Sequence, residues 1–157
     1  MKNMTLSTTI LFLAIIAIPI RSQTPKERTR HDTKLLAGVR AVLNAQRDAW
    51  NRGDIAGYMD GYSRTANTVF VSGDTVTRGW QTVLERYQRS YNSPEKMGTL
   101  TFSDLEVTPL GEDAAVALGR WQLQRANDQP HGRFTLIFRR TKQGWKIVHD
   151  HTSAASS

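Results

Sequence analysis

Two histidines near the end of the chain carry the side chains best suited to proton transfer. His149 and His151 are separated by one residue within the stretch GWKIVHDHTS. An imidazole exchanges a proton near neutral pH, and its surroundings tune that exchange. Side chains two positions apart on a strand share one face, so both rings can point the same way. We predict that His149 and His151 are catalytic or anchoring groups; for at least one of them, the alternative is a satisfied core histidine.

Three tyrosines and an arginine are predicted to bind a ligand beside them. Tyr58, Tyr62 and Tyr91 fall on the expected inward faces of helices, where hydroxyls among apolar groups are typical of small-molecule sites. Arg120 lies in an expected strand and could bind a carboxylate in a forked geometry. The alternative for Arg120 is an ion pair on the outer face of the sheet. Arg86 has the same two alternatives.

A metal site is a weaker interpretation of the histidines. His149 and His151 could share one face, with His131 or Asp54 completing a set of ligands. Two ligands on one strand fall short of the three or four protein ligands that a zinc site usually needs. We therefore predict no metal and no cofactor.

A hairpin over residues 132–153 is expected to position the histidines. If Arg140 pairs with Trp145 across the turn at residues 141–144, the apolar rows of the two strands share one face. His149 and His151 continue the second row, so both would point inward. An apolar row that ends in two imidazoles suggests the wall of a pocket.

Helices should cover that wall. Residues 23–31 are polar and predict a flexible arm, after which Asp32 or Thr33 can cap a first helix. Gly53 suits the left-handed closing position of that helix, and Asp54 can cap the next, over residues 55–62. A third helix is expected over residues 79–91. Tryptophans at helical spacing are more often core than ligand contacts, so Trp50 and Trp80 are assigned to the core.

The remaining segments predict strands. Residues 68–72 and 75–77 form a short hairpin, and residues 99–108 and 114–124 precede the long one. Helices segregated on one face of an antiparallel sheet define the α+β class. We therefore predict an α+β domain over residues 32–153, with a short tail over residues 154–157.

The first 22 residues resemble a secretory signal. A basic residue precedes an apolar run over residues 10–20, and a small residue ends the segment. The run is shorter than the roughly 20 residues that cross a bilayer as a helix, so no stable membrane insertion is expected after cleavage. We predict an exported protein, periplasmic or secreted; the alternative is that the segment stays uncleaved as an anchor, since Ile20 fits the small-residue rule poorly. The chain has no cysteine, which excludes disulfides.

The charge distribution argues against nucleic acid as a partner. The chain has 21 basic and 14 acidic residues, a net charge of +7. Removal of residues 1–22 takes away Lys2 and Arg21, which leaves 19 basic residues and a net charge of +5. These charges are scattered, without a basic run or a nucleic-acid-binding motif. Attraction of small anions remains open.

Two motifs carry a resemblance to a known family. The stretch AWNRGD at residues 49–54 resembles the end of the first helix in the nuclear transport factor 2-like superfamily. The stretch GWKIVHDHTS at residues 144–153 resembles the last strand of its SnoaL-like and unknown-function bacterial branches. It also resembles the association domain of calcium/calmodulin-dependent kinase. The resemblance covers about residues 33–153, which is nearly all of the chain after residue 22.

The resemblance implies a cone-shaped, curved antiparallel sheet wrapped on three N-terminal helices, as in the cystatin-like fold, with a pocket between them. Members are commonly homodimers through the sheet and include ketosteroid isomerases, cyclases and dehydratases. The isomerases use an aspartate base and a tyrosine, whose positions correspond here to Val71 and Gln46. Neither side chain can do that chemistry, which argues against steroid isomerisation of that type.

Two functions follow from these predictions. The first is a pocket that binds an unidentified small molecule, with isomerase-, cyclase- or dehydratase-like acid–base activity left open. The second is a non-catalytic dimerisation or assembly domain that resembles the kinase association domain. Fold alone does not separate them.

Overall fold

The structure, a computed structural model, describes residues 24–155. Within them the helices are α1 (Pro25–Asn51), α2 (Ile55–Met59), α3 (Trp80–Ser90) and α4 (Pro94–Met97). The strands are β1 (Val69–Ser72), β2 (Thr75–Arg78), β3 (Thr99–Pro109), β4 (Ala114–Gln124), β5 (His131–Thr141) and β6 (Gly144–Thr152). The predicted secretory signal, residues 1–22, lies outside the described residues. None of the helices among residues 24–155 has the length and apolar character needed to cross a membrane.

One sheet holds all six described strands, in the order β2-β1-β6-β5-β4-β3. Neighbours are antiparallel except β1 and β6, which are parallel, with Val69 beside His149. Before β1 the chain already runs along β6, because the Ile147 amide donates to the Gly61 carbonyl and the Ser63 amide to the Ile147 carbonyl. The predicted α+β class is confirmed, but the sheet is mixed rather than wholly antiparallel.

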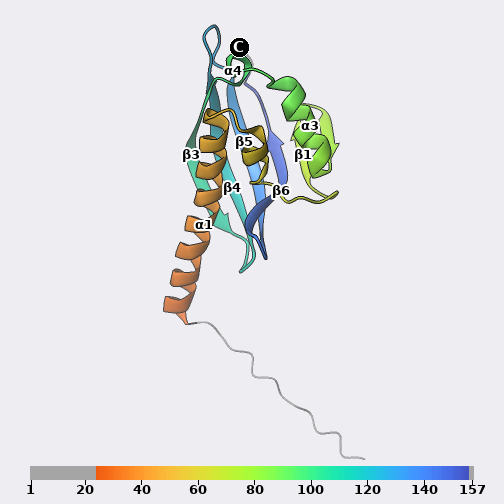
Figure 1. The fold of residues 1–157 in the computed structure, drawn as a ribbon. Helices are drawn as coiled ribbons and strands as arrows, with labels where there is room; N and C mark the ends of the chain where they lie inside the picture. The colour runs from red at the N-terminus through yellow and green to blue at the C-terminus, as the bar shows by residue number, and fades with distance from the viewer. Residues whose placement is uncertain (1–23, 156–157) are drawn as a thin grey trace, which may run out of the picture.

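The first helix begins earlier than the predicted cap at Asp32 or Thr33. Thr24 caps it: its hydroxyl accepts from the Glu27 amide at 3.3 Å, and its own amide donates to the Glu27 carboxylate at 2.9 Å. Pro25 follows at the first helical position, where no amide hydrogen is needed. Most of the predicted flexible arm is therefore helical. In Figure 1, α1 lies along one face of the sheet, and its first turns extend beyond the strands.

The AWNRGD motif at residues 49–54 ends α1 and caps α2. Gly53 has a φ of +80°, and the Asp54 carboxylate accepts from the Gly57 amide at 2.7 Å, so both predicted roles are confirmed. The Asn51 side chain exchanges two hydrogen bonds with the Leu100 backbone, at 3.0 and 2.7 Å. The Trp50 indole donates to the Met97 carbonyl at 3.2 Å. These contacts attach α1 to the start of β3.

The core fills one end of the layer between α1 and the sheet. Leu35, Val39 and Leu43 of α1 are buried in one cluster with residues of β5 and β6. Phe138 and Ile147 of those strands are fully buried. Gly38 lies so close to Trp145 that an added Cβ would be 2.5 Å from the indole ring. The other end of the layer contains a cavity.

Candidate active site

The cavity lies between the helices and the inner face of the sheet. Its volume is about 240 Å³, slightly below the roughly 300 Å³ at which drug-sized ligand sites begin. The helices contribute aromatic side chains, which are those of Trp50, Tyr58, Tyr87 and Tyr91. The strands contribute mainly apolar groups, including those of Trp121, Leu123, Phe134 and Leu136. A cavity with these walls suits a flat molecule of one or two rings.

Asp150 is the carboxylate on the cavity wall. It is only 3% exposed and projects from the inner face of β6. The Tyr62 hydroxyl donates to its Oδ2 at 2.6 Å, and the Thr152 hydroxyl donates to its Oδ1 at 2.6 Å. Burial raises the pKa of Asp150 from the ordinary 3.8 to about 6, although both hydroxyls favour the ionised form. This carboxyl group can therefore gain and lose a proton close to neutral pH.

A β-bulge explains why Asp150, rather than a histidine, points inward. Ile137 pairs with His149 and Phe138 pairs with Ile147, so Val148 has no partner on β5. The extra residue reverses the alternation of β6 after Ile147. His149 is half-buried, His151 is exposed, and neither lines the cavity. The predicted pairing of Arg140 with Trp145 is confirmed, but the prediction that both imidazoles face the interior is wrong.

The predicted tyrosines line the cavity as a cluster. Tyr58, Tyr62 and Tyr91 all contribute to its wall, and Tyr87, which was not predicted, lies between them. The Tyr58 and Tyr87 rings are 5.3 Å apart, and the Tyr87 and Tyr91 rings are 5.6 Å apart. Burial and the nearby Asp150 raise the pKa of Tyr62 well above 10. Its phenol is therefore neutral and serves as a hydrogen-bond donor.

Trp50 and Trp80 were both predicted to belong to the core, but they differ in whether they line the cavity. Trp50 packs edge-on against Tyr91, with 4.7 Å between ring centroids, and it lines the cavity as well as belonging to the core. Trp80 does not line the cavity; its indole donates to the Met59 carbonyl at 2.9 Å. One predicted core tryptophan is thus also available to a ligand.

The predicted ligand-binding arginine faces away from the cavity. Arg120 pairs with Arg133 across β4 and β5, between Gly119 and Trp121, which face the interior. It therefore lies on the outer face, as its alternative predicted, but none of the ion pairs within residues 24–155 includes it. Arg86 of α3 instead contributes to the cavity wall. Its guanidinium group lies 4.9 Å from the centre of the Phe70 ring and donates to the Thr77 hydroxyl at 3.4 Å.

The end of the described chain forms part of the cavity rim. Ser153 and Ala154 line it. The Ser153 carbonyl accepts from the Trp121 indole at 3.0 Å, and the Ser153 amide donates to the Arg133 carbonyl at 2.9 Å. This path depends on Gly132, because a Cβ there would collide with the Ser153 carbonyl oxygen.

The other residues considered from sequence have structural roles. Asp54 caps α2, and the His131 ring contacts the Gln129 carbonyl at 3.0 Å. Across residues 24–155 no three histidine or acidic side chains are grouped in a way that could hold a metal ion. Gln46, at the position of the isomerase tyrosine, lines the cavity and donates to the Tyr58 carbonyl at 3.0 Å. Val71 does not line it.

Asp150 was missed because regular alternation was assumed throughout β6. One signal was present: Ile147 and Val148 are consecutive apolar residues in a strand that otherwise alternates. Such a pair marks a place where a bulge can shift the faces. Tyr62 gave no comparable signal for its partner, since 88 positions separate it from Asp150.

Comparison with known proteins identifies relatives of this domain. A family model described as a SnoaL-like domain matches residues 39–157. Among solved structures, the chain is similar to an NTF2-like protein of unknown function from Shewanella oneidensis, at 35% identity and a TM-score of 0.73. The match covers 75% of this chain and 98% of that one. Comparison with curated proteins gives no match.

Two more distant structures share the fold. A ketosteroid isomerase-like protein from Erwinia carotovora atroseptica is 20% identical, with a TM-score of 0.63 and coverage of 78% of this chain and 97% of that one. A provisionally assigned scytalone dehydratase from Novosphingobium aromaticivorans is 6% identical, with a TM-score of 0.70 and coverage of 82% and 89%. At these identities the likeness concerns the fold alone.

Proposed function

Because the chain belongs to the SnoaL-like domain family within the NTF2-like superfamily, as its motifs predict, we propose that its cavity binds a small conjugated molecule and transfers a proton within it. The observation that carries this proposal is the buried pair of Tyr62 and Asp150, with 2.6 Å between their oxygens. The catalytic role first assigned to His149 and His151 passes to Asp150, because only this titratable group of β6 lines the cavity.

The geometry suits proton abstraction next to a carbonyl group. A carboxylate with a pKa of about 6 is mostly ionised at pH 7 and is a stronger base than an ordinary aspartate. Each oxygen of Asp150 accepts one hydroxyl hydrogen bond and keeps another lone pair. Asp150 can therefore take a proton from carbon and return it elsewhere on the same molecule. Isomerisation returns the proton to another carbon, whereas dehydration passes it to a departing hydroxyl group that leaves as water; both begin with this abstraction, which agrees with the names of the two distant neighbours.

Hydrogen–deuterium exchange of an enolisable ketone tests this proposal. The probe is 2-tetralone, a neutral two-ring ketone whose exchange in deuterated buffer is followed by NMR. We expect the wild-type protein to accelerate exchange, with half of the effect lost near pH 6, and Asp150→Asn to abolish it. Asp48→Asn, at an exposed position of α1, is the matched control and should retain the activity. Equal exchange rates with the wild type and with Asp150→Asn would overturn the proposal.

The outer face of the sheet supports a second proposal, a homodimer. Leu118 is 40% exposed on β4, and Val116 and Ile137 lie half-buried on the same face. Exposed apolar groups on an uncovered sheet face favour contact with another protein surface. The test is the mass in solution by light scattering: Leu118→Glu should yield monomers, and Asp150→Asn should leave the mass unchanged. A monomeric wild-type protein would contradict the dimer and leave the cavity proposal intact.

A further inference from the structure

Arg86 is the cation of the cavity. It projects from α3 and is half-buried. Its side chain lies over the Phe70 ring, and its protein hydrogen bond, to Thr77, is long at 3.4 Å. A planar guanidinium group has five donors in a fixed fork, and a carboxylate matches two of them. The hydrogen bond to Thr77 uses only a small part of this donor capacity.

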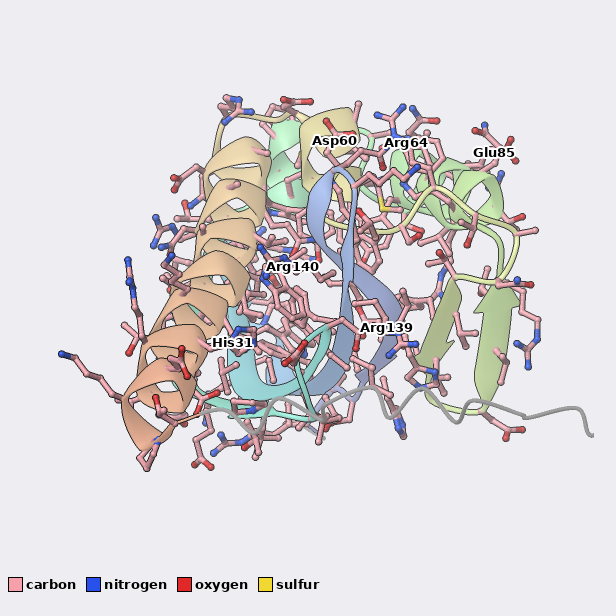
Figure 2. The ribbon with its side chains drawn as sticks, turned by 90° about the horizontal axis from the view of Figure 1, so that it is seen from below. His31, Asp60, Arg64, Glu85, Arg139 and Arg140 are labelled. Atoms are coloured by element: carbon pink, nitrogen blue, oxygen red, sulfur yellow. The ribbon has the colours of Figure 1, made fainter. Side chains whose placement is uncertain are left out.

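Asp150 lines the same cavity as Arg86 and interacts with it electrostatically, whereas Glu85 and Asp60 have other cationic partners. Glu85 precedes Arg86 in α3 but pairs with Arg89 at 4.0 Å and accepts from Gln81 at 3.0 Å. Figure 2 shows Glu85 on the side of α3 away from β6. Asp60 forms an ion pair with Arg64, and Figure 2 shows these two labelled side chains close together. Within residues 24–155 no ion pair includes Arg86. Arg86 has no ion pair and keeps free donors, so this half-buried cation favours an anionic ligand, although Asp150 offsets part of its charge.

The aromatic side chains beside Arg86 indicate the chemistry of the rest of that ligand. The Tyr87 and Phe70 rings contact each other at 5.8 Å, and Tyr58 and Trp50 continue the aromatic wall. We propose that the cavity takes a small aromatic or conjugated carboxylic acid, whose carboxylate is held by the forked donors of Arg86. This inference deepens the proposed function and rests on it. Arg86 is then the residue that determines ligand class, while Asp150 acts on the bound molecule.

The carboxylate of such a ligand would change the proton affinity of Asp150. Asp150 is surrounded by neutral Tyr58, Tyr62 and Tyr87 and by the Thr152 hydroxyl; the charged or titratable groups that act on it are Arg86 and His151. Both of these lower the pKa of Asp150 against the larger effect of burial. An anion on Arg86 cancels part of this favourable charge, so Asp150 binds a proton more tightly in the complex.

This coupling makes the affinity for the carboxylate ligand depend on pH. Because the ligand anion raises the pKa of Asp150, binding takes up a proton above about pH 6, the value in the free protein. Affinity for the acid should therefore be constant below about pH 6 and fall as the pH rises further. A neutral ligand of the same shape should lack this dependence.

The matched probes are 2-naphthoate and 2-naphthamide, which differ in charge but little in shape. We expect the wild-type protein to bind 2-naphthoate about tenfold or more tightly than the amide at pH 6, as measured by calorimetry. Arg86→Gln should remove this preference, and Arg86→Lys should retain part of it. Arg120→Gln removes the same charge from the outer face and should leave the preference unchanged.

Equal affinities of the wild-type protein for the two probes, no binding of either, or an intact preference in Arg86→Gln would each overturn the inference. Circular dichroism and thermal unfolding of each variant identify any loss of fold, and Arg86→Lys then supplies the comparison. The exchange test with 2-tetralone involves no carboxylate. Failure of the acid preference with exchange intact therefore removes only the ligand class, whereas failure of exchange removes the proposed function.

Discussion

The layer between the helices and the sheet is packed differently at its two ends, although the same strands contribute to both. Near Trp145 and Ile147, β6 packs against α1, and the layer is filled. Near Asp150, three residues after Ile147, the same strand borders a cavity of about 240 Å³. The bulge at Val148 separates the two ends. The filled end holds the fold together, which allows the other end to keep a buried carboxylate and an empty volume.

Removal of a large side chain should distinguish the two ends most clearly. Phe138 is fully buried at the filled end, so Phe138→Ala should lower the free energy of unfolding by about 3–5 kcal/mol. Phe102 is half-buried and already borders the cavity, so Phe102→Ala should cost less than half as much. Urea unfolding of both variants gives the comparison. Similar losses would show that the cavity end is packed as tightly as the other.

Ionisation of Asp150 should make the cavity end sensitive to pH. The native state holds this proton more tightly than the unfolded chain, because burial raises the pKa from 3.8 to about 6. Wild-type stability should therefore fall, relative to Asp150→Asn, by about 2 kcal/mol as the pH rises from 4 to 7. Unfolding at several pH values measures this, with Asp48→Asn as the control. A difference that does not change with pH would contradict a buried, titrating carboxylate.

Loss of one hydroxyl at the cavity should have a smaller effect. Tyr62→Phe removes a donor to the Asp150 carboxylate and should cost about 1.5–3 kcal/mol at pH 8, and less at pH 5. It should also raise the pKa of Asp150, which NMR of the labelled carboxyl carbon can follow. Tyr91→Phe is the matched control, because its hydroxyl makes no hydrogen bond to any residue from 24 to 155, and its cost should be small. Equal costs for Tyr62→Phe and Tyr91→Phe would contradict a stabilising hydrogen bond between Tyr62 and Asp150.

Substitution of the histidines should have the smallest effect. His149 and His151 lie on the outer face of β6, so His149→Gln and His151→Gln should each change the free energy of unfolding by less than about 0.5 kcal/mol. Exchange of 2-tetralone should be unchanged, in contrast to Asp150→Asn. A loss of exchange in either variant would restore the histidines as site residues.

Much of the fold could be predicted because its signals are local. The glycine turn after α1, the cap at Asp54 and the pairing of Arg140 with Trp145 each depend on residues a few positions apart. Helical spacing likewise placed Tyr58, Tyr62 and Tyr91 on inward faces. The start of α1 was missed, because a capping box beginning at Thr24 outweighs the polar composition that follows it.

The candidate site was harder to predict because it depends on one inserted residue and on distant partners. Val148 shifts the alternation of β6, which exchanges the histidines for Asp150 on the inner face. Period-two patterns carry no record of a bulge unless two apolar residues adjoin. Arg86 and Arg120 offered the same chemistry in sequence, and only the packing of α3 and the pairing of β4 separate them.

The shape of the cavity wall at Ser153 depends on a single position of β5, Gly132. A larger residue there would collide with the backbone of Ser153, which lines the cavity, at a position separate from the hydrogen-bonded pair of Asp150 and Tyr62. The shape of the cavity and the reaction chemistry thus depend on different residues. A lineage carrying this domain could therefore alter the shape of the cavity wall through one codon, without changing the residues that transfer the proton.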